Sequence, residues 1–231
     1  MDGSPNRPVP GIRQPQILLI LATLAVGLAV DVRTDFAGQI AVGAACWVIL
    51  SYLLGRLGGD ERRAMMACLV IATAGELFCS LAWGLYTYRL GNVPLFVPPG
   101  HVMMFLLGFS LSRRLSERAA NAVIGCAAAY ALAAAATGFD TFGVPLFLVL
   151  ATTSIAMRRQ RRLYASTFAL SLVLEFYGTW LGNWTWAHDV PWTALVTTNP
   201  PGTVGAFYSA LDAMVAASAF FLAPRLRPRA T

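Results

Sequence analysis

Apolar residues are gathered into eight long runs along the chain, and short polar connections separate these runs. A helix needs roughly 20 apolar residues to cross a bilayer, and each run comes near that length, although the sixth is short. The runs cover about residues 16–32, 36–55, 64–87, 95–112, 119–137, 142–157, 163–184 and 203–223. The pattern therefore predicts an all-α fold, a polytopic membrane helix bundle with about eight transmembrane helices.

Composition agrees with this prediction. The chain has 231 residues, of which 57% are hydrophobic and 12% are charged, whereas a soluble domain carries about 25% charged residues. The four cysteines all lie inside apolar runs, which is typical of small buried residues rather than of disulfide partners or metal ligands. They are Cys46, Cys68, Cys79 and Cys126.

The basic residues, all of them arginine, set an orientation. Most lie in the second, fourth and sixth connections and after the last run: Arg56, Arg62, Arg63, Arg113, Arg114, Arg118, Arg158, Arg159, Arg161, Arg162, Arg225, Arg227 and Arg229. The odd-numbered connections hold only Arg33 and Arg89. By the positive-inside rule both termini are cytoplasmic, and we expect a bacterial inner (cytoplasmic) membrane protein. The net charge of +6 belongs to these connections, so we expect no nucleic-acid partner.

Two stretches of the chain resemble each other. We name residues 76–101 the first cassette and residues 175–202 the second cassette. Both hold a Glu in an apolar run, then Gly-x-aromatic-Thr-aromatic, then Val-Pro, then Pro-Pro-Gly. Matching residues lie about a hundred positions apart, as in Glu76 and Glu175, Tyr86 and Trp184, and Pro98 and Pro200. Proline is tolerated in the first turn of a helix, so the Pro-Pro steps should begin helices.

The cassettes predict a duplicated fold. Each half holds four of the predicted helices, and an even number returns the chain to its starting side, so the halves are parallel repeats about an axis along the membrane normal. The first two helices of each half match only weakly, at Asp35-Phe-Ala-Gly38 and Asp140-Thr-Phe-Gly143. The expected units are a disordered tail (1–14), a first repeat (15–115), a second repeat (116–224) and a basic tail (225–231).

Three acids lie inside apolar runs. Glu76 precedes Tyr86 by ten residues, which places it about 15 Å below that end of its helix and near the bilayer midplane. Glu175 occupies the equivalent place, and Asp212 lies at a similar depth. A carboxylate there costs several kcal/mol unless it is protonated or paired, so such residues face a bundle interior or a cavity. We expect Glu76 and Glu175 to face each other near the repeat axis. The alternative is that the acids are protonated and only join helices.

One histidine adds to the candidate chemistry. His101 opens the fourth run, where a capping or core role competes with a catalytic one. Its match in the second cassette is Thr203, and Asp212 has no match in the first half. Such asymmetry in a duplicated fold is what a single off-axis active site leaves. The candidate catalytic residues are Glu76, Glu175, Asp212 and His101.

Aromatic and amide side chains gather toward the outer end of the predicted helices. An interfacial aromatic belt is the better interpretation for Tyr88, Trp186 and Trp192. Trp83 and Trp180 lie deeper, where their rings would line an apolar pocket or stabilise a cation. The candidate substrate-binding residues are Trp83, Tyr86, Tyr88, Asn92, Trp180, Asn183, Trp184 and Asn199. Arg89 and Asp189 are candidates for an ion pair between the halves.

Several other chemistries lack their motifs. The sequence holds no P-loop, no GxGxxG followed by an acid, no GxSxG and no HExxH. It has no CxxC or Cys/His cluster of the kind that binds zinc, and its two histidines are too few for a histidine-rich di-iron site. No serine has a convincing adjacent base. We therefore expect neither a metal nor a cofactor.

About a quarter of the chain carries a family resemblance. It lies in Gly84-x-Tyr86-x-Tyr88, in the run from Gly91 to Pro98, in Met103-Met104 and, more weakly, in Gly182-Asn183-Trp184-Thr185-Trp186. At these positions the chain resembles the carotenoid biosynthesis membrane proteins, a family that includes carotenoid hydratases. It departs from that family at Pro99-Gly100-His101, where an aliphatic-Trp step is expected.

The resemblance implies cofactor-free acid catalysis on an isoprenoid double bond. A buried, protonated Glu would act as the general acid, and Trp83 or Trp180 would stabilise the resulting cation. A water held by Asp212 or His101 would capture the cation, and the same site without water would cyclise or isomerise the polyene. The implied partners are an apolar or amphipathic lipid substrate and the membrane lipids.

Two other interpretations stay open. Parallel repeats and midplane acids also match a proton-coupled transporter or a lipid flippase. In a non-catalytic membrane assembly partner, the same cassettes would only pack helices together.

Overall fold

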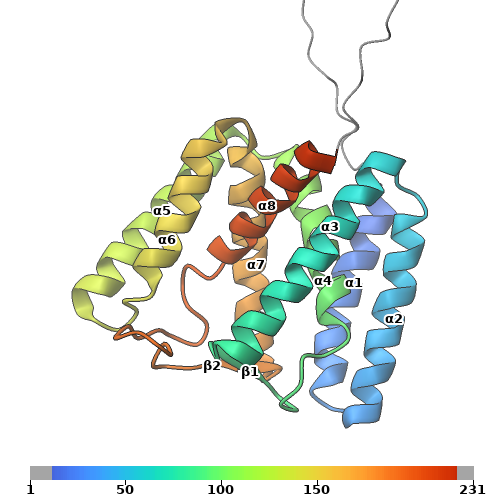
Figure 1. Ribbon diagram of the computed structural model, residues 1–231, viewed down its shortest axis with the longest axis horizontal. Helices are drawn as coiled ribbons and strands as arrows, with labels where there is room; N and C mark the ends of the chain where they lie inside the picture. Colours follow the sequence, from blue (N-terminus) through green and yellow to red (C-terminus); the bar gives the residue numbers. More distant parts are fainter. Residues whose placement is uncertain (1–11, 223–231) are drawn as a thin grey trace, which may run out of the picture.

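The computed structural model describes residues 12–222, and in this part of the chain all eight predicted runs form helices (Figure 1). The helices are α1 (Gln14–Asp31), α2 (Phe36–Leu54), α3 (Gly59–Glu76), α4 (Val97–Ser112), α5 (Glu117–Thr137), α6 (Gly143–Ala156), α7 (Arg161–Leu181) and α8 (Ala206–Leu222). Helix α1 begins inside the expected tail 1–14. The rest of that tail up to residue 11, and the basic tail 225–231, lie outside the described residues.

The helices have the lengths and surfaces of a membrane bundle. Four segments are long and apolar enough to cross a membrane: Gln14–Asp31, Phe36–Leu54, Gly59–Ala82 and Glu117–Thr137. Large apolar side chains also point outward from many helices, as at Val48 (70% exposed), Val70 (66%) and Val173 (68%). Soluble monomers rarely expose so much contiguous apolar surface. These lengths and exposed apolar side chains indicate a helical membrane protein.

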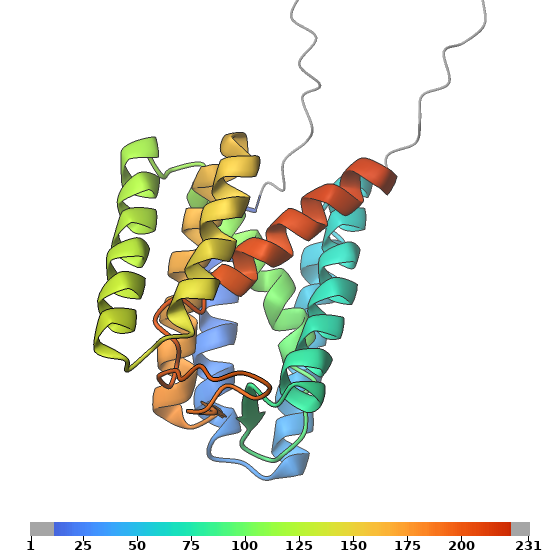
Figure 2. The same cartoon turned by 60° about the vertical axis from the view of Figure 1, so that its left-hand side comes forward.

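Four helices cross at the centre of the bundle. Helix α4 packs along α7 and α3 packs along α8, while α3 also contacts α4 and α7 also contacts α8. The α1–α2 hairpin lies on one side, against α4 and α7, and the α5–α6 hairpin lies on the other, against α7 and α8 (Figures 1 and 2). The central four helices include both Glu-bearing helices, so they form the frame of the candidate site.

The third and seventh runs end differently from their prediction. After Glu76, α3 continues as a π-helix, Leu77–Ala82, in which Trp83 N–H bonds to the Phe78 carbonyl. Helix α7 stops at Gly182, which adopts a left-handed φ of 88°, a conformation that glycine reaches without steric cost. Predicted helix 64–87 therefore ends early, and the same holds for 163–184.

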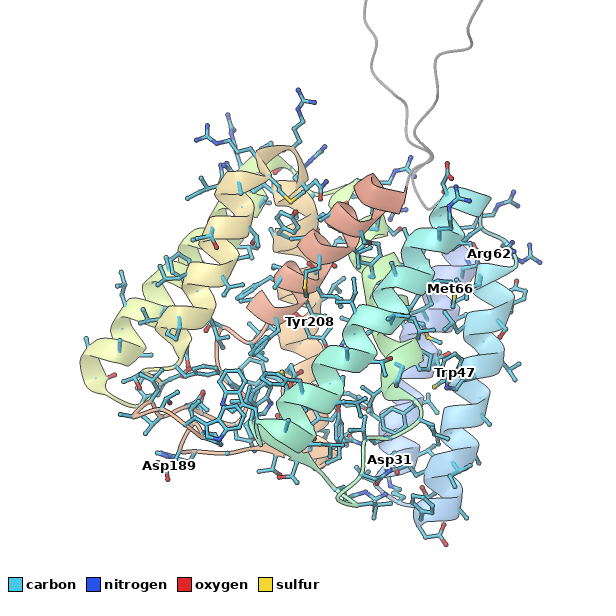
Figure 3. All side chains as sticks on the ribbon, viewed as in Figure 1. Asp31, Trp47, Arg62, Met66, Asp189 and Tyr208 are labelled. Atoms are coloured by element: carbon cyan, nitrogen blue, oxygen red, sulfur yellow. The ribbon has the colours of Figure 1, made fainter. Side chains whose placement is uncertain are left out.

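Beyond these helix ends, the two aromatic-Thr-aromatic motifs form strands. Strand β1 (Tyr86–Tyr88) pairs antiparallel with β2 (Trp184–Trp186), with Thr87 opposite Thr185. The strands lie at one end of the bundle, and the connections rich in arginine, including labelled Arg62, lie at the other end (Figures 1 and 3). The predicted runs 64–87 and 163–184 are therefore wrong where they extend into these motifs, at Tyr86, Thr87 and Trp184, because they continue past the residues that end the helices.

The two Pro-Pro steps have different outcomes. Pro98 and Pro99 lie in the first turn of α4, as predicted. Pro200 and Pro201 precede α8, which begins only at Ala206. The chain between β2 and α8 instead forms an ordered loop, because buried polar groups hold it in place.

Two buried aspartates hold the connections at the strand end. Asp31, 1% exposed, accepts hydrogen bonds from Gln39 Nε2 (3.0 Å) and Asn183 Nδ2 (2.8 Å), and Arg89 Nη2 lies 3.5 Å from its Oδ1. Asp140, fully buried, accepts from the hydroxyls of Tyr130 (2.8 Å) and Thr197 (2.9 Å) and from Gly202 N–H (3.1 Å). The α1–α2 hairpin is thus fastened to both cassettes through Asp31, and the α5–α6 hairpin is fastened to the second cassette through Asp140.

Candidate functional site

Both predicted glutamates point into the bundle and accept hydrogen bonds from their own cassette. The hydroxyls of Tyr86 and Tyr88 donate to Glu76 Oε2 at 2.8 and 2.6 Å. The indole N–H groups of Trp184 and Trp186 donate to Glu175 Oε2 at 2.8 and 3.1 Å. The side chain of Glu76 is 11% exposed and residue Glu175 is 7% exposed. Neither carboxylate faces lipid, as predicted.

The strands explain why the motif reads aromatic-Thr-aromatic. Side chains two residues apart on a strand point to the same face, so all four outer residues of the two motifs point into the bundle. Each of these four is buried, whereas Thr87 and Thr185 between them are exposed. The Tyr86 and Trp186 rings, opposite each other in the register, have centroids 4.6 Å apart. Antiparallel pairing therefore gathers the four ring donors over the two carboxylates.

His101 joins this set from the first full turn of α4. Its Nε2 lies 3.2 Å from Glu76 Oε1, and its Nδ1 lies 3.1 Å from the Val97 carbonyl oxygen. Its ring also stacks on Tyr208 of α8, with centroids 5.1 Å apart and planes at 12°. Both oxygens of Glu76 are therefore engaged, one by two tyrosine hydroxyls and the other by imidazole. Contact with Glu76 favours the site role of His101 over a capping role alone.

These groups line one cavity of about 60 Å³. A space of that size holds a few water molecules. Its polar wall consists of Glu76, Glu175, His101, Tyr86, Tyr88, Trp184, Trp186 and Tyr208. Its other wall is mostly apolar and comes from α1, α2 and α4, including Leu24, Gly27 and Val42. The cavity thus lies off the centre of the bundle, on the side of the α1–α2 hairpin.

The two carboxylates differ in how completely they are paired. Within the described part of the chain, Glu175 Oε1 accepts no hydrogen bond, whereas both indoles donate to its Oε2. An unpaired carboxylate in apolar surroundings is costly unless it carries a proton. Glu175 therefore offers an oxygen that can hold a proton in the cavity, and Glu76 offers a carboxylate already held by His101 and the two tyrosines.

Asp212 does not lie in this cavity. It is 2% exposed in α8, where Thr167 Oγ1 of α7 donates to its Oδ2 at 2.6 Å. It follows Tyr208 by one helical turn, toward the arginine-rich end. The expectation that Asp212 holds a water beside the substrate is therefore wrong, and among the candidates only His101 has that position.

The two deeper tryptophans also lie outside the cavity. Trp180 is 78% exposed on the outer face of α7, because it lies five residues after Glu175 and so on another face of the helix. Trp83 donates its Nε1–H to the Pro191 carbonyl at 2.8 Å and stacks on Trp192, with centroids 5.9 Å apart. The π-helix shifts Trp83 away from the face of Glu76. Their predicted role in lining the pocket is wrong.

The three predicted asparagines form hydrogen bonds with the connections and strands around the site. Asn183, 1% exposed, donates to the Leu28 carbonyl and to Asp31. Asn92 donates to Gln39 Oε1 at 2.8 Å, and Asn199 Oδ1 accepts from Trp186 N–H at 3.0 Å. None of the three lines the cavity. They position the strands rather than contact a cavity ligand.

The predicted pair of Arg89 and Asp189 is not formed. Arg89 faces Asp31 instead and donates to the carbonyls of Asp31 (2.6 Å) and Thr34 (2.9 Å). The side chain of Asp189 is 94% exposed and lies beside His188. Labelled Asp31 and Asp189 lie at the same end of the bundle but apart from each other (Figure 3).

Two residues of the cavity's polar wall, Trp186 and Tyr208, are not among the predicted site residues. Trp186 is 5% exposed and bonds Glu175, although it was assigned to the interfacial belt, whereas Trp192 is 72% exposed in agreement with that assignment. The available signal was that Trp186 lies two residues after Trp184, since the same spacing links Tyr86 to Tyr88. Tyr208 gave only a weak signal, its place one turn before Asp212.

Comparison with protein-family models, with curated proteins and with solved structures finds no match to this chain. Within residues 12–222, no group of three or more His, Cys, Asp or Glu side chains is placed to hold a metal ion. The site is therefore interpreted from its own geometry: two carboxylates, one imidazole and four ring donors around a small, mostly apolar cavity.

Proposed function

We propose first that the chain crosses the membrane eight times, as two parallel four-helix repeats with both termini in the cytoplasm of a bacterium. The antiparallel pairing of β1 with β2 and the matched crossings of α3 with α8 and of α4 with α7 support a two-fold relation. Asp35 before α2 and Asp140 before α6 also each accept from a glycine N–H three residues later, Gly38 (3.0 Å) and Gly143 (3.1 Å). The segregation of arginine supports the orientation.

We propose further that the protein is a cofactor-independent enzyme that adds water to, or rearranges, a double bond of an isoprenoid or carotenoid-type lipid. The single observation that carries this proposal is the pairing in one cavity of a carboxyl with a free oxygen, Glu175, and a carboxylate held by His101. General acid catalysis needs one group that gives a proton and another that takes one. The mostly apolar wall toward α1 and α2 suits contact with hydrocarbon, and a cavity of about 60 Å³ admits only the reacting part of such a substrate.

In the proposed mechanism, Glu175 Oε1 gives its proton to one carbon of the double bond. The electron pair of the π bond forms the new C–H bond, and a tertiary cation develops at the other carbon. The neighbouring rings of Trp184, Trp186 and Tyr86 present π faces that stabilise positive charge. The indole N–H groups, which already bond Glu175 Oε2, stabilise the carboxylate that forms.

Water then completes the addition. A water beside His101 attacks the cation, and its proton passes to the Glu76 carboxylate of the His101–Glu76 pair, because both ring nitrogens of His101 already face acceptor oxygens. Return of one proton to Glu175 restores the site, so the net reaction is alkene plus water to tertiary alcohol. If no water is present, loss of a neighbouring C–H proton to the same pair gives isomerisation, and attack by a second double bond gives cyclisation.

The test is coexpression of the chain with an acyclic carotenoid pathway in a bacterial host, followed by mass analysis of the pigments. We expect a product that is heavier by one water or is isomeric with the substrate. Glu175→Gln should lower its formation by about 10²- to 10⁴-fold, the usual contribution of a general acid, and Glu76→Gln should also lower it. Asp189→Asn, which alters an exposed acid, should leave product formation unchanged.

The other interpretations give different results. A wild-type protein that makes no new pigment but drives pH-gradient-dependent uptake of lipid into proteoliposomes would identify a transporter. Full cellular function in both Glu→Gln variants would show that the acids only pack helices, as in an assembly partner. No observation in the described residues favours either alternative over the enzyme.

A further inference from the structure

A row of buried polar groups runs along one face of α7 and ends at Glu175. Starting from Gln160, the row contains Tyr164, Thr167, Ser171 and Glu175 at spacings of three or four residues, which places them on one face of the helix. All four are at most 7% exposed. The fifteen residues from Gln160 to Glu175 span about 22 Å. The row therefore leads from the arginine-rich end of the bundle to the cavity.

Asp212 lies beside the middle of this row. Thr167 Oγ1 donates to its Oδ2 at 2.6 Å, and α8 packs against both α7 and α3. Within residues 12–222, Asp212 Oδ1 accepts no hydrogen bond. This oxygen is not fully enclosed by protein atoms. At the start of the row, Tyr164 OH donates to Gln160 Oε1 at 3.1 Å.

The last part of the path approaches the cavity from two helices. Tyr208 precedes Asp212 by one turn of α8, and helical side chains lean toward the N-terminal turn, so Asp212 leans toward Tyr208. Tyr208 lines the cavity together with Glu175 and lies midway along the bundle (Figure 3). Ser171 lies one turn before Glu175 on α7. Asp212 is therefore one turn from the cavity along α8, and its partner Thr167 is two turns from Glu175 along α7.

The matching face of α3 carries no such row. Positions 99 residues earlier hold Met65, Cys68 and Ala72 where α7 holds Tyr164, Thr167 and Ser171, and all three are buried. Among these matched positions only the last pair, Glu76 and Glu175, is the same residue in both helices. Buried hydroxyl and carboxyl groups are costly without hydrogen bonds. Packing alone did not require the polar set, because the apolar set fills the equivalent space.

We infer that Asp212, Thr167 and Ser171 form a proton relay, bridged by water, that reloads Glu175 from the arginine-rich end of the bundle. The role in reloading rests on the proposed function, whereas the relay itself does not. Each transfer moves one proton from a donor oxygen to an acceptor oxygen. The relay therefore needs no redox partner: bulk water supplies the proton, and Glu175 in its carboxylate form receives it. Asp212 is a relay residue, because it touches neither substrate nor reacting atoms.

The test follows proton exchange at Glu175 without any substrate. Purified protein in nanodiscs is moved from H₂O to D₂O, and infrared difference spectra follow the carbonyl band of the protonated carboxyl that disappears in Glu175→Gln. We expect Asp212→Asn and Thr167→Val to slow this exchange by about 10- to 100-fold. Ser171→Ala, a smaller change, should slow it as well. Cys68→Ala, at the position in α3 that matches Thr167, should leave the rate unchanged.

Each outcome decides the inference. Wild-type exchange rates in Asp212→Asn and Ser171→Ala, or equal slowing in Cys68→Ala, would overturn it. Absence of a protonated carboxyl band that depends on Glu175 would also overturn it. Slowed exchange in a protein that makes no pigment product would keep the relay and reject the proposed enzyme. Normal exchange in a protein that does make the product would reject the relay alone.

Discussion

Gly178 on α7 sets how Trp184 reaches Glu175. A methyl group added at Gly178 would meet the six-membered ring of Trp184, and this close approach leaves room only for hydrogen. Trp184 lies in β2, beyond the end of α7, and folds back along the last turns of the helix to bond Glu175. The absence of a side chain at one position therefore allows the indole to act as a hydrogen-bond donor in the cavity.

Gly178→Ala should destabilise the protein by about 1–3 kcal/mol, the usual cost of overpacking, and should displace Trp184. We expect a lower midpoint of thermal unfolding in detergent and a shifted tryptophan fluorescence spectrum. Gly125 on α5 has open space around its Cα, so Gly125→Ala should instead stabilise by about 0.4–1 kcal/mol. Equal midpoints for the two variants would contradict the packing argument.

Sequence predicted the acids of the site better than its tryptophans. Glu76 and Glu175 were found because an acid in an apolar run must face inward. The prediction places Trp180 in the pocket, because it lies inside the apolar run, and Trp186 in the interfacial belt, because it lies beyond the run, but Trp180 is exposed and Trp186 is buried. Gly182 ends α7 between them, so Trp180 follows the helical period and Trp186 follows the two-residue period of a strand. Only the exact helix end, which sequence patterns locate poorly, separates the two cases.

At the scale of elements, Asp31 fastens the α1–α2 hairpin to both cassettes. It contacts Arg89 of the first cassette and Asn183 of the second, and its side chain is 1% exposed while that of Arg89 is 24% exposed. Within the described residues, Arg89 Nε and Asn183 Oδ1 are buried without a partner. Unpaired buried groups subtract from the stability that the cluster contributes.

Removal of the Arg89 charge should still be costly, because it leaves the Asp31 carboxylate buried without its cation. Arg89→Met should lower the free energy of unfolding by about 3 kcal/mol, measured in detergent by thermal or denaturant unfolding. Arg63 and Asp60 form an exposed ion pair on α3, with side chains 55% and 68% exposed. Arg63→Met should therefore change stability by less than about 1 kcal/mol. If both variants lose the same stability, the Asp31 cluster does not fasten the hairpin.

The elements themselves were predictable to different degrees. Long apolar runs predicted the positions of all eight helices, of which four are long and apolar enough to cross a membrane. The π-helix at Leu77–Ala82 and the strands β1 and β2 were not predicted. Three-residue strands owe their conformation to pairing with each other across about a hundred residues, and no local pattern records that pairing. Asp31 was missed for the same reason, since its partners are distant in sequence.

At the scale of the whole molecule, the proposed repeat explains why one cavity serves two cassettes. The cavity borders α1, α2, α4 and α7, whereas on the opposite side α5 packs directly against α7. The α5–α6 hairpin therefore packs against the central helices differently from the α1–α2 hairpin. Within a duplicated frame, this difference would give a single site, in agreement with His101 and the α7 row each occurring in one half only.

The orientation of the bundle decides which side of the membrane each end of the cavity and of the α7 row faces. Arginine-bearing connections should face the cytoplasm, and the strands with the loop to α8 should face the other side. Two exposed small residues lie at opposite ends of the bundle and can be labelled: Gly59 at the start of α3 and Ala194 in the loop after β2. Gly59 has no neighbour within contact of an added side chain. Both sites accept a cysteine without disturbing packing.

In a background with all four cysteines replaced by alanine, Ala194→Cys should react with a membrane-impermeant maleimide in intact spheroplasts. Gly59→Cys should react only after the membrane is opened. The reverse labelling would invert the orientation and place the α7 row toward the periplasm, so that Glu175 would take its proton from outside. Labelling of both sites in intact spheroplasts would contradict eight spans, because the loops on α3 and after β2 would then share one side. The opposite sides of Gly59 and Ala194 therefore test the span number and the direction of proton entry in one experiment.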